Sequence, residues 1–119
     1  MIDFTIPEET KAIRDKVRAF VQSECHPAEE VCTADNFDET LAGLRSKARS
    51  QGLWCPFIPT EHGGMGLRPL ANALVQMELG ESHLGALSLN TQGPDDATML
   101  TLSERGTDLH REEFVVPLL

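Results

Sequence analysis

Proline and glycine divide this chain into short segments, and that division limits the possible folds more than any other feature of the sequence. Proline lacks a backbone donor and glycine favours turns, so each marks a point where a regular element begins or ends. Between these points, apolar residues recur three or four positions apart, and no segment alternates as a half-buried strand does. The sequence therefore predicts an all-α fold of five or six short helices in an orthogonal or bundle-like arrangement.

A first helix is predicted after Thr5, which has the capping-box spacing to Glu8. Its apolar face recurs at Ile13, Val17, Phe20 and Val21. We expect Pro27 to end this helix, and residues 26–36 to form a connector or a ragged helical turn.

A second helix is predicted from Asp38, a good N-cap, to Gly52, which favours a left-handed helix end. Its apolar face is Leu41, Leu44 and Ala48. Two prolines within residues 53–59 exclude a regular helix, so we expect an extended apolar connector that crosses the core. A glycine-rich turn at residues 63–66 follows.

The second half of the chain predicts short helices separated by glycines. One begins at Pro69 with the stripe Leu70, Ala73, Leu74 and Met77. A nearly apolar helix is predicted over residues 84–92, and Pro94 opens another that Gly106 closes. Thr107 is expected to cap a last helix, which carries Phe114 and Val115.

The nearly apolar segment from Leu84 to Gly93 has three interpretations. It has scarcely any polar face before Asn90. A helix of this kind is buried on most sides, lines a ligand cavity, or forms an interface with a partner.

Candidate catalytic patterns are weak. The glycines of residues 63–66 have neither the preceding strand nor the following Lys-Ser/Thr of a phosphate-binding loop, so we interpret them as a tight turn. Cys25 and His26 are adjacent, which seldom aligns a nucleophile with its base. Glu78 and Glu81 share a helix face, but a solvated rim is the commoner role of such a pair. The four histidines and three cysteines lack the spacing of a metal site, so none is expected.

Charge and cysteine content restrict the possible partners. A formal net charge of -9 over 119 residues argues against nucleic acid and against an anionic membrane surface. Three irregularly spaced cysteines favour a reducing compartment, and the N-terminus has no signal or transit pattern, so we expect a cytoplasmic protein.

Five segments match one pattern in a fixed order. Residues 8–20 resemble an opening amphipathic helix, residues 51–66 a G-L-x…P-x-E-Y-G-G-x-G connector, and residues 77–80 an x-E-L-G/A helix. Residues 90–99 are similar to N-x-x-A-P-D-x-x-N-M, and residues 106–119 to G-T-x-x-Q-K-x-x-[YF]-L-x-P-L-L. From end to end, the chain resembles the N-terminal helical domain of the acyl-CoA dehydrogenase superfamily. It departs from the pattern at His62, where Tyr is usual, and at His110, where Gln is usual.

The resemblance implies that residues 1–119 are one domain of a larger FAD-dependent enzyme, which would remove the α-proton of an acyl-CoA with a glutamate and pass the β-hydride to flavin N5. That glutamate, most flavin contacts, a β-domain and a C-terminal helical bundle lie outside this chain. We therefore expect no catalytic residue in this chain. The residues that would contact the flavin stay unknown, and we do not expect the isolated chain to retain FAD.

The resemblance also implies a wall of the acyl pocket, with Leu89, Asn90 and Gly93 nearest the substrate. The partners would be acyl-CoA and the remaining domains, or copies of the enzyme in a homo-oligomer. Two other interpretations remain open: a stand-alone helical interaction module, and a degenerate remnant without catalysis. The sequence does not decide the acyl chain, the electron acceptor, the oligomeric state, or whether the chain is a natural truncation, an engineered piece or a pseudogene product.

Overall fold

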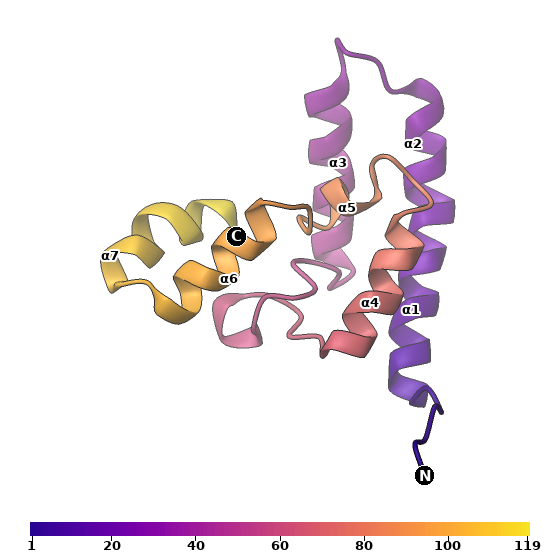
Figure 1. The fold of residues 1–119 in the computed structure, drawn as a ribbon. Coiled ribbons are helices and arrows are strands. Elements are labelled where there is room, and N and C mark those ends of the chain that lie inside the picture. The colour runs from indigo at the N-terminus through magenta and orange to yellow at the C-terminus, as the bar shows by residue number, and fades with distance from the viewer.

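The computed structural model describes residues 1–119 and is all-helical, as predicted. The molecule is flat, with extents of 45 × 40 × 22 Å. Its α-helices are α1 (Glu8–Phe20), α2 (His26–Val31), α3 (Phe37–Ser50), α4 (Pro69–Leu79), α5 (Gly85–Ser88), α6 (Asp95–Arg105) and α7 (Asp108–His110). Figure 1 shows α1 to α5 gathered in one body, from which α6 and α7 project.

The first helix does not end at Pro27, and that prediction is wrong. A π-helical turn, η1 (Val21–Cys25), joins α1 to α2, so one rod runs from Glu8 to Val31. Pro27 lies in the first turn of α2, after the wider turn, which gives the proline ring the room that a regular α-helix lacks. Residues 26–31 of the expected connector are therefore helical.

Helix α3 begins one residue before the predicted cap, and Asp38 lies inside its first turn. Asn36 organises the turn instead: its Oδ1 accepts from the amide of Thr33 at 2.7 Å, and its Nδ2 donates to the carbonyl of Val31 at 2.9 Å. At the other end Gly52 adopts φ 72°, the left-handed conformation predicted for it.

The apolar connector predicted over residues 53–59 crosses the core. Leu53, Cys55, Pro56 and Ile58 are each fully buried there. The 3₁₀ turn η2 (Thr60–His62) follows, and then the glycine turn, in which Gly63 has φ 94° and Gly66 has φ 62°.

Helix α4 begins at Pro69 as predicted, but the predicted stripe is wrong. The buried side chains are Ala71, Val75 and Leu79, whereas Leu70 and Met77 are exposed. This helix is apolar on more than one face, so the spacing of its residues permits two stripes. Packing against α1 selects the stripe that contains Val75, and an apolar face points outward.

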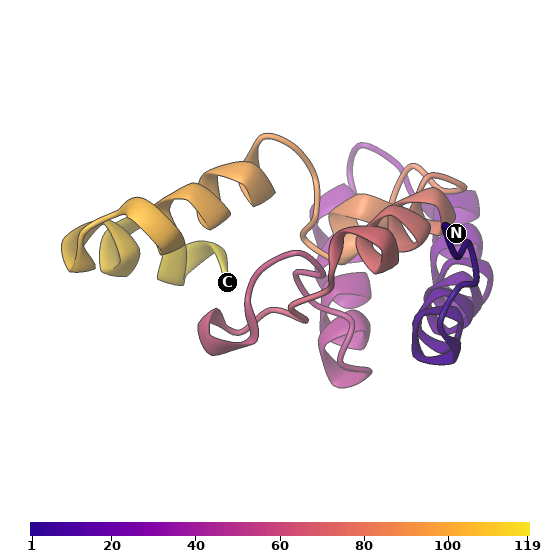
Figure 2. The ribbon, with the colours of Figure 1, turned by 60° about the horizontal axis from the view of Figure 1, so that its bottom comes forward.

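The second half of the chain ends in a helical hairpin. Helix α5 is a single turn, shorter than predicted, because Asn90, two residues after its end, adopts φ 54°. Pro94 immediately precedes α6. Thr107 caps α7 as predicted, and a π-helical turn, η3 (Arg111–Val115), and a 3₁₀ turn, η4 (Val116–Leu118), complete the hairpin. Figure 2 shows this hairpin extending away from α1 and α4.

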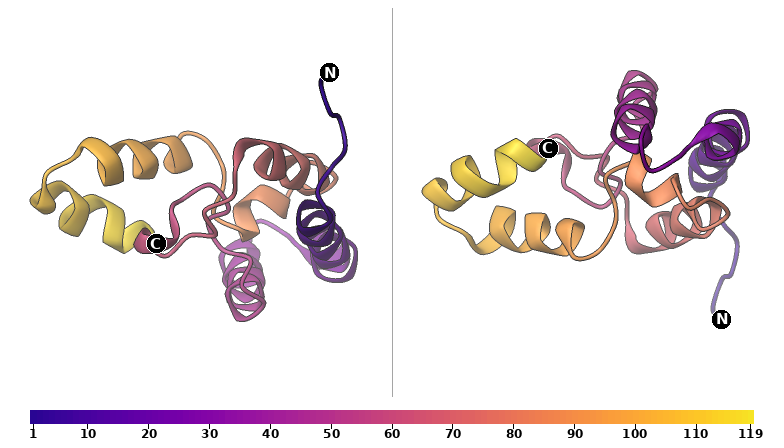
Figure 3. Two further views of the ribbon diagram at one scale, coloured as in Figure 1. Left: turned by 90° about the horizontal axis from the view of Figure 1, so that it is seen from below. Right: turned by 90° about the horizontal axis from the view of Figure 1, so that it is seen from above.

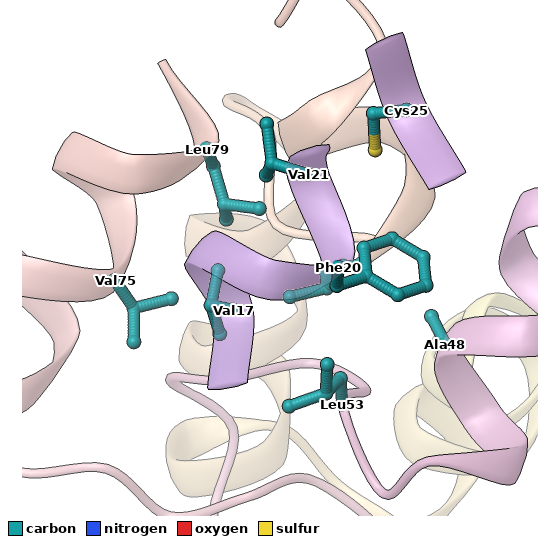
Figure 4. Packing of buried hydrophobic residues seen from close by; sticks show 9 residues of the cluster. Val17, Phe20, Val21, Cys25, Ala48, Leu53, Val75 and Leu79 are labelled. Carbon is teal, nitrogen blue, oxygen red and sulfur yellow. The ribbon is translucent and has the colours of Figure 1, made fainter. Parts of the chain in front are cut away.

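Two hydrophobic clusters with no residue in common hold the chain together. The larger joins α1, η1, α3 and α4 through Val17, Phe20, Val21, Cys25, Ala48, Leu53, Val75, Leu79 and Leu89. In Figure 4, Phe20 points toward Ala48 of α3, and Val17 faces Val75 of α4. The smaller joins the connector to the hairpin through Trp54, Cys55, Ile58, Met99 and Val115. Each large side chain in these clusters contributes about 1.5–3 kcal/mol by leaving water.

No helix of the structure combines the length and the apolar content that crossing a bilayer requires.

Candidate functional site

The three predicted substrate-binding residues lie in one segment but in different surroundings. Leu89 is fully buried and belongs to the larger hydrophobic cluster. Asn90 is 6% exposed, and Gly93 is exposed at the start of the passage to α6. Of the three, Gly93 alone has its surface free for a ligand in the isolated domain.

Asn90 holds three parts of the chain together. Its side-chain Nδ2 donates to the carbonyl of Leu118 at 2.7 Å, and it lies 3.3 Å from the Sγ of Cys55. The amide of Cys55 in turn donates to the carbonyl of Leu89 at 2.9 Å. The segment after α5 is therefore fixed to the apolar connector on one side and to the end of the hairpin on the other.

Two further side chains position this segment, and the sequence analysis missed both. Gln76 of α4 donates from Nε2 to the hydroxyl of Thr91 at 2.7 Å. Arg45 of α3 donates from Nε to the carbonyl of Leu87 at 3.0 Å. Both lie among the polar residues of amphipathic helices, where helical spacing alone does not separate a buried contact from a solvated one.

The loop before α5 is fixed by a carboxylate of α2. Glu29 Oε1 accepts from the hydroxyl of Ser82 at 2.7 Å and from the amide of His83 at 2.5 Å. Burial on its own would raise the pKa of Glu29, but these bonds outweigh it and leave the pKa below its usual value. Leu84, which follows this loop, is buried, in agreement with the core interpretation of this segment.

Gly93 has open space where a side chain would begin. A Cβ built on Gly93 would meet no atom within 4 Å. Gln92 and Gly93 therefore form the open edge of a segment that is otherwise buried, which leaves the cavity-wall and interface interpretations available for this edge.

A large cavity lies elsewhere. It has a volume of about 930 Å³ and runs past the N-terminal ends of α1 and α4, the glycine turn and Trp54. None of Leu89, Asn90 and Gly93 lines it. This cavity is called the Trp54 groove below, and the sequence predicted no binding residue in it.

The glycine turn does not fit the diphosphate of a flavin nucleotide. A phosphate cradle needs free backbone amides. Here the amides of Gly63, Gly64, Met65 and Gly66 donate within the chain, to the carbonyls of Thr60, Pro59, Cys55 and Ile58 respectively. The tight-turn interpretation agrees with these bonds, and the turn has no amide left for an anion.

The other candidate pairs are separated in the structure. Cys25 Sγ contacts the Ser88 hydroxyl at 3.6 Å, whereas His26 Nε2 lies 3.2 Å from the carbonyl of Glu81. Glu78 is paired with Arg18, which holds it through two nitrogens at 2.7 and 3.0 Å. Neither pair is arranged for proton transfer, and no group of three or more His, Cys, Asp or Glu side chains is placed to hold a metal ion.

Comparisons with known proteins give one consistent result. Residues 7–119 match the family model for the acyl-CoA dehydrogenase N-terminal domain. Acyl-CoA dehydrogenase family member 11 of Gallus gallus is 30% identical over 115 residues, which cover 87% of this chain. The (R)-benzylsuccinyl-CoA dehydrogenase of Thauera aromatica is 26% identical over 126 residues, which cover 96% of it.

Comparison of the fold with solved structures indicates the same family. A solved structure from Mycobacterium abscessus, assigned as an acyl-CoA dehydrogenase, superposes with a TM-score of 0.87 at 25% identity and covers 97% of this chain. The alignments cover only 14% of the Gallus gallus relative, 31% of the Thauera aromatica relative and 32% of the solved chain. The chain spans a minor part of each of these proteins, and within that part it belongs to the acyl-CoA dehydrogenase family as the N-terminal helical domain.

Proposed function

We infer that this chain serves as the N-terminal helical domain of an FAD-dependent acyl-CoA dehydrogenase and contributes one wall of its acyl pocket. In this assignment FAD supplies the redox chemistry of α,β-dehydrogenation, and the chain's own residues shape the space for the acyl group. The single observation that carries the proposal is the rigid segment after α5, in which Leu89 and Asn90 are fixed and Gly93 is left open.

The rigidity of this segment suits a pocket wall. A wall that selects substrates must keep its shape while a ligand binds. The bonds of Asn90 to Leu118 and of Gln76 to Thr91 hold the backbone just before Gly93 without using Gly93 itself. A glycine at the open edge leaves room for a long or bulky acyl chain.

Substitution of Gly93 in a full-length enzyme that carries this domain tests the assignment. Gly93→Leu should shift the chain-length preference in kcat/KM toward shorter acyl-CoA substrates. Gly43→Leu in α3 is the matched control, because a Cβ there also meets nothing within 4 Å and Gly43 lines a different hollow, beside Ser23 and Pro27. An unchanged chain-length profile in Gly93→Leu would contradict the pocket-wall role.

The isolated chain gives a second, simpler test. The glycine turn has no free amides for a phosphate, so we expect the purified chain to be colourless after incubation with FAD and an acyl-CoA, and inactive as a dehydrogenase. Retention of the flavin absorbance bands after gel filtration would contradict the conclusion that the domain does not hold the cofactor alone.

Exposed apolar side chains favour a second candidate, a helical interaction module. Leu70 and Met77 of α4, and Leu109, Phe114 and Val116 near the end of the chain, are each more than half exposed. Exposed apolar surface is used either by neighbouring domains of one enzyme or by a separate partner. A monomer in light scattering that binds little hydrophobic dye would count against the separate module, and non-cooperative melting would favour a remnant without function.

A further inference from the structure

The Trp54 groove is lined by apolar side chains, glycines and a few charged residues. Its floor is formed by the buried residues Thr10, Trp54 and Ala71, and Ile13, Met65 and Leu67 add apolar surface. Gly52, Gly63, Gly64 and Gly66 also line it and contribute no side chains. A channel with an apolar floor and glycine walls admits an extended peptide, because the incoming backbone can approach closely.

The charge of the groove is opposite to that of the chain. Its lining includes Arg49 and Arg68 but only one acid, Glu9, whereas the chain has 19 acidic and 10 basic residues. Arg49 is already engaged, because its guanidinium donates to an oxygen of Leu119 at 2.9 Å and lies 4.0 Å from the centroid of the Trp54 ring. Arg68 makes no ion pair in the structure. The groove therefore suits an occupant that combines apolar side chains with a negative charge.

A segment of this composition is attached to the end of the groove. Residues 1–6 leave the N-terminal end of α1 and extend away from the helices (Figure 3). Ile2 is 75% exposed and Phe4 is 86% exposed, although both are large apolar side chains. They alternate with Asp3 and Thr5, which is the pattern of an extended segment with one apolar side.

We propose that residues 1–6 fold back into the Trp54 groove as an intramolecular strap, with Ile2 and Phe4 on its apolar lining and Asp3 beside Arg68. In the extended arrangement the Asp3 carboxylate accepts only from the amide of Thr5, at 2.8 Å. The reach is short, because Pro7, directly after the segment, already lines the groove. Asp3 is four residues from Pro7, and an extended chain covers about 13 Å over that length. Closing the strap would bury the exposed side chains of Ile2 and Phe4 against the lining of the groove.

Nuclear magnetic resonance of the 119-residue chain tests the strap, since four glycine amides line the groove and report on its occupancy. In the wild type we expect backbone order parameters of residues 3–6 near 0.85, typical of rigid backbone. In Ile2→Ser/Phe4→Ser these should fall below about 0.6, typical of flexible backbone, and the amide resonances of Gly52, Gly63, Gly64 and Gly66 should shift. Asp3→Asn should produce part of the same change.

Two controls isolate the effect. Val31→Ser removes an exposed apolar side chain at the far end of the first rod, and Asp35→Asn removes an exposed charge near it. Neither substitution should shift the amide resonances of the four glycines that line the groove. The proposal is overturned if residues 3–6 are already flexible in the wild type, or if the glycines shift no more in Ile2→Ser/Phe4→Ser than in Val31→Ser. It is also overturned if the wild-type shifts depend on protein concentration, since the occupant would then be the segment of a second copy.

Discussion

Cys55 and Asn90 lie 35 positions apart in the sequence and contact each other through Asn90 Nδ2 and Cys55 Sγ at 3.3 Å. Both have left-handed backbones, with φ 47° at Cys55 and φ 54° at Asn90, and no other residue besides glycine has a positive φ in this structure. Conformations of this kind cost free energy in residues that carry a Cβ. They persist here where the connector, the segment after α5 and the hairpin meet.

A β-branched residue at position 55 should destabilise the fold more than the same residue at position 25. Both cysteines are fully buried, but Cys25 has ordinary helical angles, with φ -72°. The left-handed conformation adds about 1–2 kcal/mol for a residue with a branched Cβ. Urea unfolding should therefore show a larger loss for Cys55→Val than for Cys25→Val by about that amount, and equal losses would contradict the strained geometry.

Asn90 should stabilise the domain without any ligand. Asn90→Ala removes the donor to Leu118 and places a Cβ residue at φ 54°, which together should lower the free energy of unfolding by about 1–3 kcal/mol. Asn90→Gly keeps the backbone conformation and should lose less. If Asn90 acted only on substrate, both variants would unfold at the wild-type urea concentration, so the midpoint of the transition distinguishes the two roles.

The three cysteines should differ sharply toward a thiol reagent. Burial raises the pKa of the Cys25 thiol and of the Cys55 thiol, whereas Cys32 is partly exposed at the end of α2. The thiolate is the reactive form, so the two buried thiols combine a low thiolate fraction with poor access. Reaction with a chromogenic disulfide should release one equivalent under native conditions and three in guanidinium chloride. Rapid reaction of a second native thiol would show that the core opens readily.

Stability should fall at acid pH through two carboxylates. The hydrogen bonds from Arg18 lower the pKa of Glu78, and the bonds from Ser82 and the amides after it lower that of Glu29. A group whose pKa is lower in the folded state stabilises the fold at pH values above its unfolded pKa, and this contribution is lost as the pH falls through the folded pKa. Chemical unfolding between about pH 6 and pH 3 should show this decline, which spans the usual carboxyl range.

The matched variants are Glu78→Gln and Glu29→Gln. Each should be less stable than the wild type near neutral pH and should show a flatter decline toward acid, because the titrating group is gone. Glu104→Gln is the control, since that carboxylate is exposed and makes no ion pair in the structure. A decline of unchanged steepness in both Glu78→Gln and Glu29→Gln would assign the acid sensitivity to other groups.

The capping box of the last helix should tolerate glutamine at position 110. Thr107 Oγ1 accepts from the amide of His110 at 3.3 Å, and His110 Nδ1 accepts from the amide of Thr107 at 3.2 Å. Loss of a threonine cap costs about 1 kcal/mol. Thermal unfolding should show such a loss for Thr107→Ala, a smaller one for His110→Ala, and almost none for His110→Gln. A loss in His110→Gln equal to that in His110→Ala would contradict the reciprocal bond.

Helical spacing predicted the elements of this fold better than it predicted their faces. The stripe of α1 through Val17 and Phe20 is correct, because charged residues occupy its other sides. In α4, Met77 and Val75 both belong to plausible apolar stripes, and only contact with α1 decides that Val75 is buried. The continuation past Pro27 depends on a π-helical turn, for which the sequence carries no marker that we recognised.

The burial of the segment that carries the candidate residues was predictable from the sequence, but its contacts were not. The nearly apolar character of residues 84–93 correctly indicated burial, which Leu84 and Leu89 show. The partners of Asn90 come from positions 55 and 118, and such distant contacts are set by the packed fold rather than by local spacing. Whether Gly93 meets an acyl chain stays a prediction, and the Gly93→Leu experiment addresses it.

The thickness of 22 Å has a consequence for how this domain can change. An α-helix with its side chains is about 10–12 Å across, so the molecule is about two helices thick, and each of the longer helices α1, α3, α4 and α6 has exposed residues. Only 26 of its 119 residues are buried. Substitutions at the other positions change the side chains on the two broad faces and leave the buried core unchanged. A domain this thin can keep its buried core unchanged while substitutions on each broad face adapt that face to the neighbour packed against it.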